Sequence, residues 1–198
     1  MLVTDDALLR DRDLLEIGRA VERGGVTAVQ LRLKQATPRD LVDATRTLVA
    51  ALRIPVLVND RIDVALASGA AGVHLGPDDL ALPLARQIAP AGFIVGASAG
   101  TVDEAEAARG ADYWGVGPWR ASGTKPDAGL ALGVEGFQRL VALAKGIPCV
   151  AIGGVRPEDV AAVLSAGGAG VAVVSGILGT EDVEAAARRY WNSVNGER

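Results

Sequence analysis

The strongest constraint on the fold is an alternation of short apolar runs with amphipathic segments along the whole chain of 198 residues. Strands are expected at 2–4, 28–33, 56–58, 72–75, 93–98, 113–116, 149–152 and 170–174. Apolar residues at helical spacing predict helices at 13–23, from Thr37 to Leu52, at 62–68, at 82–88, from Thr101, and at 134–144, 157–165 and 180–191. Strictly alternating strands and helices predict a parallel sheet covered by helices.

The number of repeats selects among parallel folds. Eight strand–helix units at a spacing of about 25 residues predict an α/β fold of the (β/α)8 TIM barrel type, at the compact end of its size range. A doubly wound sheet would carry a G-x-G-x-x-G turn, which the sequence lacks. Since no linker or low-complexity segment interrupts the pattern, residues 1–198 are expected to form a single domain.

Composition and charge narrow the class of partner. Hydrophobic residues make up 49% of the chain but aromatic residues only 4%, which suits aliphatic strands buried under helices. A net charge of −4 argues against a general nucleic-acid or membrane surface, so small phosphorylated molecules held in a local basic pocket are the expected partners. The sequence leaves a homo-oligomer open.

The compartment is predicted from cysteine usage and hydropathy. The single Cys149 cannot form an internal disulfide and fits a reducing cytoplasm. The first residues do not resemble a signal peptide, and no apolar run reaches the ~18 residues of a membrane span. A soluble, cytoplasmic protein is therefore expected.

A long loop, 115–129, follows the sixth expected strand and is rich in Gly and Pro. It holds Ser122, Thr124 and Lys125 close together. Hydroxyls and an ammonium group on such a loop suit an anionic, phosphorylated ligand. A solvated surface loop is the alternative interpretation.

Polar residues alternate with apolar ones in the second expected strand. Gln30, Arg32 and Lys34 share one face, and we expect that face to point into the barrel mouth, where the active sites of such barrels lie. An arginine in that position needs either a bound anion or an ion pair within the protein. The sequence leaves both interpretations open.

Carboxylates follow two neighbouring strands. Asp60 ends the third strand, and Asp78 and Asp79 follow the fourth. Since adjacent strands lie about 5 Å apart, both loops can reach one Mg²⁺ ion, which takes one or two carboxylates together with water and phosphate oxygens. The alternative is that Asp60 and Asp78 cap the helices that follow.

Glycines end the last two βα turns. Gly153 and Gly154 end the seventh strand, and Val174, Ser175 and Gly176 end the eighth. Backbone N–H groups of these two turns often bind phosphate in such barrels, although glycines of tight turns would look the same. His74, the only histidine, is expected to be packed and hydrogen-bonded inside its strand.

Seven motifs in one order resemble a known enzyme family over nearly the whole chain. They are Val29-Gln30-Leu31-Arg32 with Lys34, Asn59-Asp60, Gly72-Val73-His74-Leu75-Gly76 with Asp78-Asp79, Gly110-Ala111-Asp112-Tyr113 with Gly115-Val116-Gly117-Pro118, Thr124-Lys125, Ala151-Ile152-Gly153-Gly154, and Val173-Val174-Ser175. Together they resemble thiamine phosphate synthase, a Mg²⁺-dependent β/α barrel. That family joins 4-amino-5-hydroxymethyl-2-methylpyrimidine diphosphate to a thiazole phosphate and releases diphosphate.

The resemblance implies roles for individual residues. The pyrimidine diphosphate would be held by Gln30, Arg32, Lys34, Asn59, Ser98 and Lys125, of which Arg32, Ser98 and Lys125 are the expected catalytic residues. The thiazole phosphate, carboxylated or not, would be held by Ser122, Gly123, Thr124, Gly154, Ser175 and the backbone of Val174. Asp60 and Asp79 would bind Mg²⁺ as the cofactor.

The chain departs from the family pattern at a few positions. Ser122 and Gly100 stand where Thr and His are common, and Trp119-Arg120 adds bulk and charge to the long loop. Two alternatives remain: a thiazole tautomerase of the sister family, and a barrel that binds thiazole phosphate without catalysis.

Overall fold

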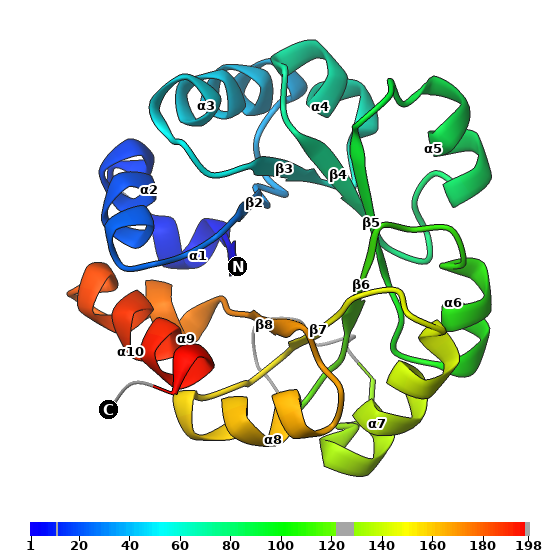
Figure 1. Cartoon of the computed structure of the whole chain (residues 1–198). Helices are drawn as coiled ribbons and strands as arrows, with labels where there is room; N and C mark the ends of the chain where they lie inside the picture. Colours follow the sequence, from blue (N-terminus) through cyan, green and yellow to red (C-terminus); the bar gives the residue numbers. More distant parts are fainter. Residues whose placement is uncertain (11, 122–128, 197–198) are drawn as a thin grey trace.

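The chain folds into a barrel of eight parallel strands surrounded by helices, as Figure 1 shows down its axis. The computed structural model describes residues 1–10, 12–121 and 129–196. Its strands are β1 (Leu2–Val3), β2 (Val29–Leu31), β3 (Val56–Asn59), β4 (Gly72–Leu75), β5 (Ile94–Ser98), β6 (Tyr113–Val116), β7 (Cys149–Ile152) and β8 (Gly170–Ala172). The predicted TIM barrel is confirmed.

The strands pair in sequence order from β1 to β8, each parallel to the next. A bridge between Leu2 and Val173 brings the end of β8 back beside β1. Val3 N–H donates to Val173 O at 2.9 Å, and Val173 N–H donates to Met1 O at 3.1 Å. These two bonds close the barrel.

The helices lie outside the strands (Figure 1). They are α1 (Asp6–Leu9), α2 (Leu14–Arg23), α3 (Pro38–Ala51), α4 (Ile62–Ser68), α5 (Leu82–Ile88), α6 (Val102–Ala107), α7 (Gly133–Ala144), the 3-10 turn η1 (Pro157–Asp159), α8 (Val160–Ser165), α9 (Ser175–Leu178) and α10 (Val183–Asn195). The local sequence explains where several of these helices begin. Thr37 caps α3 by accepting from Asp40 N–H, with Pro38 in the first turn, and Thr101 caps α6 in the same way.

Several elements differ from the sequence prediction, among them α10, which runs from Val183 to Asn195 where a helix at 180–191 was expected. Strands β2 and β8 end two residues earlier than expected, at Leu31 and Ala172. Helices α1 and α9 were not predicted, because four residues are too few to display a helical period. Both short helices follow strand ends directly, so they border the barrel mouth.

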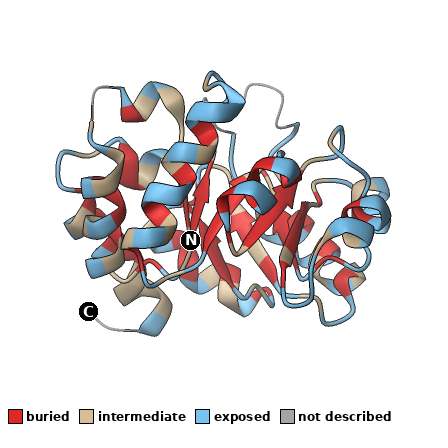
Figure 2. Cartoon of the chain, turned by 90° about the horizontal axis from the view of Figure 1, so that it is seen from above, coloured by how far each residue is buried: buried red, intermediate tan, exposed pale blue. Residues whose placement is uncertain are grey.

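The apolar core lies between the strands and the helices. Val58, Val73 and Trp114 point outward from the barrel and are fully buried under helices. Figure 2 shows the same division, with buried strands at the centre and exposed surface on the outer faces of the helices. No helix of the described chain is both long enough and apolar enough to cross a membrane.

Candidate active site

The described residues of the predicted site gather at the carboxyl ends of the strands. Gln30 lies in β2, Asn59 and Ser98 are the last residues of β3 and β5, Gly154 follows β7, and Val174 and Ser175 follow β8. Active sites of this fold lie at that end of the barrel. The predicted site residues Ser122, Gly123, Thr124 and Lys125 lie outside the described residues.

Arg32 forms an ion pair with Asp5, across the ends of β2 and β1. Its Nη1 lies 3.0 Å from Asp5 Oδ2, and the two side chains are 20% and 13% exposed. Thr4 Oγ1 fixes the same turn by accepting from Arg32 N–H at 2.7 Å and donating to Arg32 O at 3.1 Å. The interpretation of Arg32 as a member of an ion pair within the protein therefore holds. Because a guanidinium has five N–H donors, Arg32 can pair with Asp5 and still donate hydrogen bonds to an anion.

The expectation that Gln30, Arg32 and Lys34 share one face of a strand is wrong, because only Gln30 lies in β2. Because β2 ends at Leu31, Arg32 and Lys34 belong to the turn that follows. Asp6 shapes this turn, since its Oδ2 accepts from Lys34 N–H at 2.8 Å. Sequence reasoning assigned no role to Asp5 or Asp6, although two carboxylates directly after the first strand were a usable signal.

Lys34, Asp60 and Asp79 form one charged cluster at the ends of β2, β3 and β4. Lys34 Nζ lies 3.3 Å from Asp60 Oδ2, and the carboxyl groups of Asp60 and Asp79 lie close to each other. Burial and, in addition, the neighbouring Asp60 carboxylate raise the pKa of Asp79 to about 6. Gly76 N–H donates to Asp79 Oδ2 at 2.6 Å and opposes this shift.

The capping interpretation of Asp60 and Asp78 is wrong. Helix α4 has Arg61 at its N-cap and α5 has Ala81, and neither helix receives a side-chain cap hydrogen bond. Asp60 instead adopts a left-handed backbone, φ 64°, which Asp tolerates better than most residues. Its N–H donates to His74 O at 2.8 Å, which ties the end of β3 to β4.

The donor set of Asp60 and Asp79 fits a small, hard cation. Two adjacent carboxylates repel each other when both are charged, and a divalent ion removes that repulsion. Within the described ranges, no group of three or more His, Cys, Asp or Glu side chains is placed to hold a metal. Two carboxylates suit Mg²⁺, which keeps several waters and binds substrate phosphate oxygens.

His74 is packed and hydrogen-bonded, as its sequence context predicts. Its Nδ1 lies 2.9 Å from Tyr113 Oη, and its Nε2 lies 3.1 Å from Ser98 Oγ. Burial raises the pKa of the Tyr113 phenol well above its usual value. Tyr113 therefore enters the site although its sequence context indicated only a buried strand.

The turns after β6 and β7 are bound to each other. Trp119 N–H donates to Ile152 O at 2.8 Å, and Arg120 N–H donates to Gly153 O at 2.9 Å. Gly154 has φ 66°, and a Cβ there would lie 3.0 Å from Arg120 Cβ. Glycine is therefore required here by the backbone itself, whatever ligand the turn binds.

The side chains of Trp119 and Arg120 are engaged in contacts with neighbouring elements of the barrel. Trp119 is buried and packs edge-on against Phe137, with 5.6 Å between ring centroids. The guanidinium of Arg120 forms a bidentate pair with Asp159, whose side chain is 7% exposed. These contacts fix the described start of the long loop against α7 and the 3-10 turn η1.

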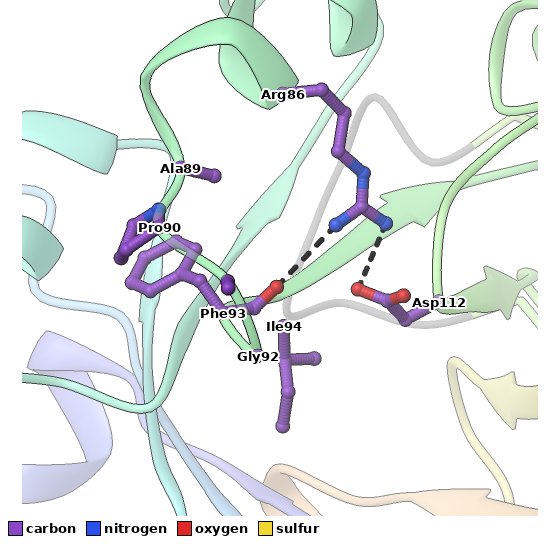
Figure 3. Close-up of a pocket in the computed structure, with 8 residues that line it drawn as sticks. Arg86, Ala89, Pro90, Gly92, Phe93, Ile94 and Asp112 are labelled. Carbon is purple, nitrogen blue, oxygen red and sulfur yellow. Dashed lines mark hydrogen bonds and ion pairs between the residues drawn. The ribbon is translucent and has the colours of Figure 1, made fainter.

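A pocket of about 500 Å³ lies at the opposite end of the barrel, at the amino ends of β5 and β6. Figure 3 shows the Arg86 side chain reaching the Phe93 carbonyl at 3.3 Å and Asp112 at 2.8 Å. Asp112 also accepts from Val95 N–H at 2.7 Å. Since these groups satisfy one another, the pocket is a structural feature of the barrel floor.

The family model described as thiamine monophosphate synthase matches residues 1–177. The chain belongs to this family. It is 47% identical to the thiamine-phosphate synthase of Moorella thermoacetica over 183 residues, 90% of this chain and 87% of that protein. It is also 47% identical to the thiamine-phosphate synthase of Azorhizobium caulinodans over 192 residues, 94% and 90% of the two chains.

A solved structure supports the same family. Thiamine phosphate pyrophosphorylase from Pyrococcus furiosus has a TM-score of 0.88 and 36% sequence identity to this chain. The match covers 98% of this chain and 94% of that protein. The resemblance seen in the seven sequence motifs is thus confirmed for the thiamine monophosphate synthase family.

Proposed function

We propose that this chain is a thiamine-phosphate synthase that joins the pyrimidine diphosphate to a thiazole phosphate. Membership of the family and 47% identity to proteins of that name support the reaction. The contact between the Asp60 and Asp79 carboxyl groups, with Lys34 beside them, is the observation that carries the finer mechanism. It offers a cation site beside basic side chains, as a departing diphosphate needs.

Asp60 and Asp79 would hold Mg²⁺ in this mechanism. The bound ion supplies positive charge to the oxygens of the leaving diphosphate. Arg32 and Lys34 come from the neighbouring turn and offer further cationic groups to the same anion. Asp5 and Asp6 hold that turn, so the two side chains are positioned before the ligand arrives.

The reaction we propose is a dissociative substitution. The bond between the pyrimidine methylene carbon and the diphosphate oxygen breaks, and diphosphate leaves with the electron pair. The aminopyrimidine ring donates electron density to the carbon, and the lone pair of the thiazole nitrogen then forms the new C–N bond. No base has to remove a proton from this nucleophile, so the residues of the site act by binding, orienting and stabilising charge.

The thiazole phosphate is proposed to bind at the turns after β7 and β8. Gly154 and Val174-Ser175 lie at the ends of neighbouring strands, which brings their backbones to one side of the mouth. The roles assigned from the sequence would add further residues of the long loop. The thiazole phosphate site would be completed by Ser122, Gly123 and Thr124, and the diphosphate site by Lys125. We also propose a cytoplasmic location, for which the lone buried Cys149 is the support.

The decisive experiment supplies both purified precursors and measures thiamine phosphate and diphosphate, with Mg²⁺ and with a chelator. We expect coupling that requires Mg²⁺. The double variant Asp60→Asn with Asp79→Asn should fold normally yet couple about 10²-fold more slowly or worse, because it removes both anionic ligands. Asp78→Asn, an exposed carboxylate on the same turn, is the matched control and should keep full activity.

The other interpretations of the family give different results. A thiazole tautomerase or a non-catalytic thiazole phosphate binder forms no thiamine phosphate and is indifferent to chelation. Full coupling in the chelator, or full coupling by the double variant, would refute the Mg²⁺ mechanism while leaving the synthase activity intact.

A further inference from the structure

Four polar side chains lie in a row across the inside of the barrel, and three of them, Tyr113, His74 and Ser98, are hydrogen-bonded in sequence. Gln30 of β2 contacts Tyr113 of β6, Tyr113 contacts His74 of β4, and His74 contacts Ser98 at the end of β5. Gln30, His74 and Tyr113 are buried, at 4%, 8% and 9% exposure. We call these four residues the barrel relay.

Two glycines make the room for this relay. Gly96 lies beside both His74 and Tyr113 in the sheet, and a Cβ there would overlap the Tyr113 ring. Gly115 pairs with Ser98, and a Cβ there would lie 3.0 Å from His74 Cε1. The two rings pack against each other with centroids 5.5 Å apart. The barrel interior is therefore shaped around these side chains.

The direction of the hydrogen bonds follows from what each group can donate. The Tyr113 phenol stays protonated because burial raises its pKa, and its contact with Gln30 lowers that pKa, as a donor to the phenol oxygen does. We infer that the phenol oxygen accepts from Gln30 and that its O–H donates to His74 Nδ1, 2.9 Å away. A neutral imidazole that accepts at Nδ1 carries its proton on Nε2. That N–H donates to Ser98 Oγ.

We propose that the barrel relay is a positioning device that makes Ser98 a hydrogen-bond donor toward an acceptor atom of the pyrimidine diphosphate. Ser98 Oγ receives a hydrogen bond from His74, so its own O–H is directed to another partner at the barrel mouth. Ser98 touches the substrate, and Tyr113 and His74 act through it. The identity of the substrate rests on the proposed function, whereas the direction of the relay rests on the contacts among Gln30, Tyr113, His74 and Ser98.

The first test reads the His74 tautomer directly. The chain contains a single histidine, so untagged protein labelled with ¹⁵N-histidine gives the imidazole signals of His74 alone. At neutral pH we expect a neutral ring with the proton on Nε2 and an unprotonated Nδ1. A proton on Nδ1, in either the neutral or the charged ring, would overturn the relay, whether or not the protein makes thiamine phosphate.

The second test asks whether Tyr113 acts through Ser98. Tyr113→Phe keeps the ring and removes the hydroxyl, and with it the donor to His74 and the contact with Gln30. It should lower kcat/KM for the pyrimidine diphosphate by about two- to tenfold, the range of one hydrogen bond. In a Ser98→Ala background the same change should have no further effect, because its target is gone. An equal loss in both backgrounds would show that Tyr113 does not act through Ser98.

Tyr190→Phe is the matched control. Tyr190 is the other tyrosine of the chain, is also buried, and donates to Val155 O at 2.9 Å, away from the relay. Tyr190→Phe should lower kcat/KM by the same factor in the wild-type and in the Ser98→Ala background. If its effect on kcat/KM disappeared in the Ser98→Ala background, the relay would not be specific to Tyr113. Wild-type protein that forms no thiamine phosphate would refute the proposed function, and the ¹⁵N experiment would still decide the relay.

Discussion

Lys34 and Asp60 connect the turns after two neighbouring strands, with 3.3 Å between Nζ and Oδ2. The lysine side chain is 53% exposed and the aspartate side chain 27% exposed, so the lysine is the more accessible partner of the pair. One lysine therefore serves two partners in the proposed mechanism: the carboxylate that binds the metal and the diphosphate that arrives with it.

Changing Lys34 should move two measurements in opposite directions. Lys34→Met removes a positive charge next to Asp60, so we expect Mg²⁺ binding, measured by calorimetry, to tighten by about two- to fivefold. Coupling should nevertheless slow, because a cation on the diphosphate is lost. Lys145→Met, an exposed lysine on the C-cap of α7, is the control and should change neither. Weaker Mg²⁺ binding in Lys34→Met would contradict the prediction.

Lys125 is predicted from sequence to act mainly in the transition state. Its ammonium should stabilise charge as diphosphate departs, so Lys125→Ala should slow coupling about 10²-fold while thiazole phosphate binding weakens far less. Single-turnover rates and equilibrium binding of thiazole phosphate supply the two numbers. Equal losses in both would make Lys125 a simple binding residue.

The Arg120–Asp159 pair should contribute a pH-dependent part of the stability. The Arg120 guanidinium lowers the pKa of Asp159 below its ordinary 3.8. Because the pKa of this carboxyl is lower in the folded than in the unfolded protein, the pair stabilises the fold at pH values above the unfolded pKa. This stabilisation is lost as the pH falls toward the folded pKa. Arg120→Met should therefore lower the free energy of unfolding, measured in urea, at pH 7, and should lower it less below pH 3.8. A cost that is independent of pH would argue that only packing was lost.

Cys149 should resist thiol reagents in the folded protein. It is 1% exposed, and burial raises its pKa from 9.0 to about 11, so at pH 8 the thiolate fraction is about a hundredfold below that of an ordinary cysteine. The unfolded chain deprotonates first, so stability is expected to fall as pH rises from 9.0 to about 11. Cys149→Ala should show a flatter decline over that range. Rapid labelling of native protein at pH 8 would contradict this prediction.

The sequence predicted the barrel because its signals are local and repeated. Apolar runs and caps such as Thr37 and Thr101 lie within single elements, so α4, α5, β4, β6 and β7 were predicted with the bounds that the structure shows. Site residues at strand ends follow from the barrel rule, since all parallel strands end on one face. Their assigned roles stay predictions.

The contacts of Arg32 and Tyr113 with distant elements could not be predicted. Arg32 pairs with Asp5 because β2 ends early and Thr4 binds the turn, which no local pattern displays. Tyr113 has the composition of a buried strand, and its link to His74 depends on sheet register and on space left by Gly96. Gly154 was predicted to lie in a turn that binds phosphate, but the space beside its Cα is occupied by Arg120. Gly154→Val should therefore strain the backbone and also disturb any ligand bound at this turn.

The seam between β8 and β1 has a consequence for synthesis of the chain. Leu2 and Val173 meet only when the last strand joins the first, which makes this the contact of longest sequence separation within the sheet. Contacts of this kind form late, because the entropy of closing the intervening chain must be overcome first. The seam also brings Val174 and Ser175 to the same mouth as Arg32. A nascent or truncated chain that lacks the eighth strand is therefore expected not to assemble the proposed substrate site, so ligand binding would report that this strand has been made and has joined the sheet.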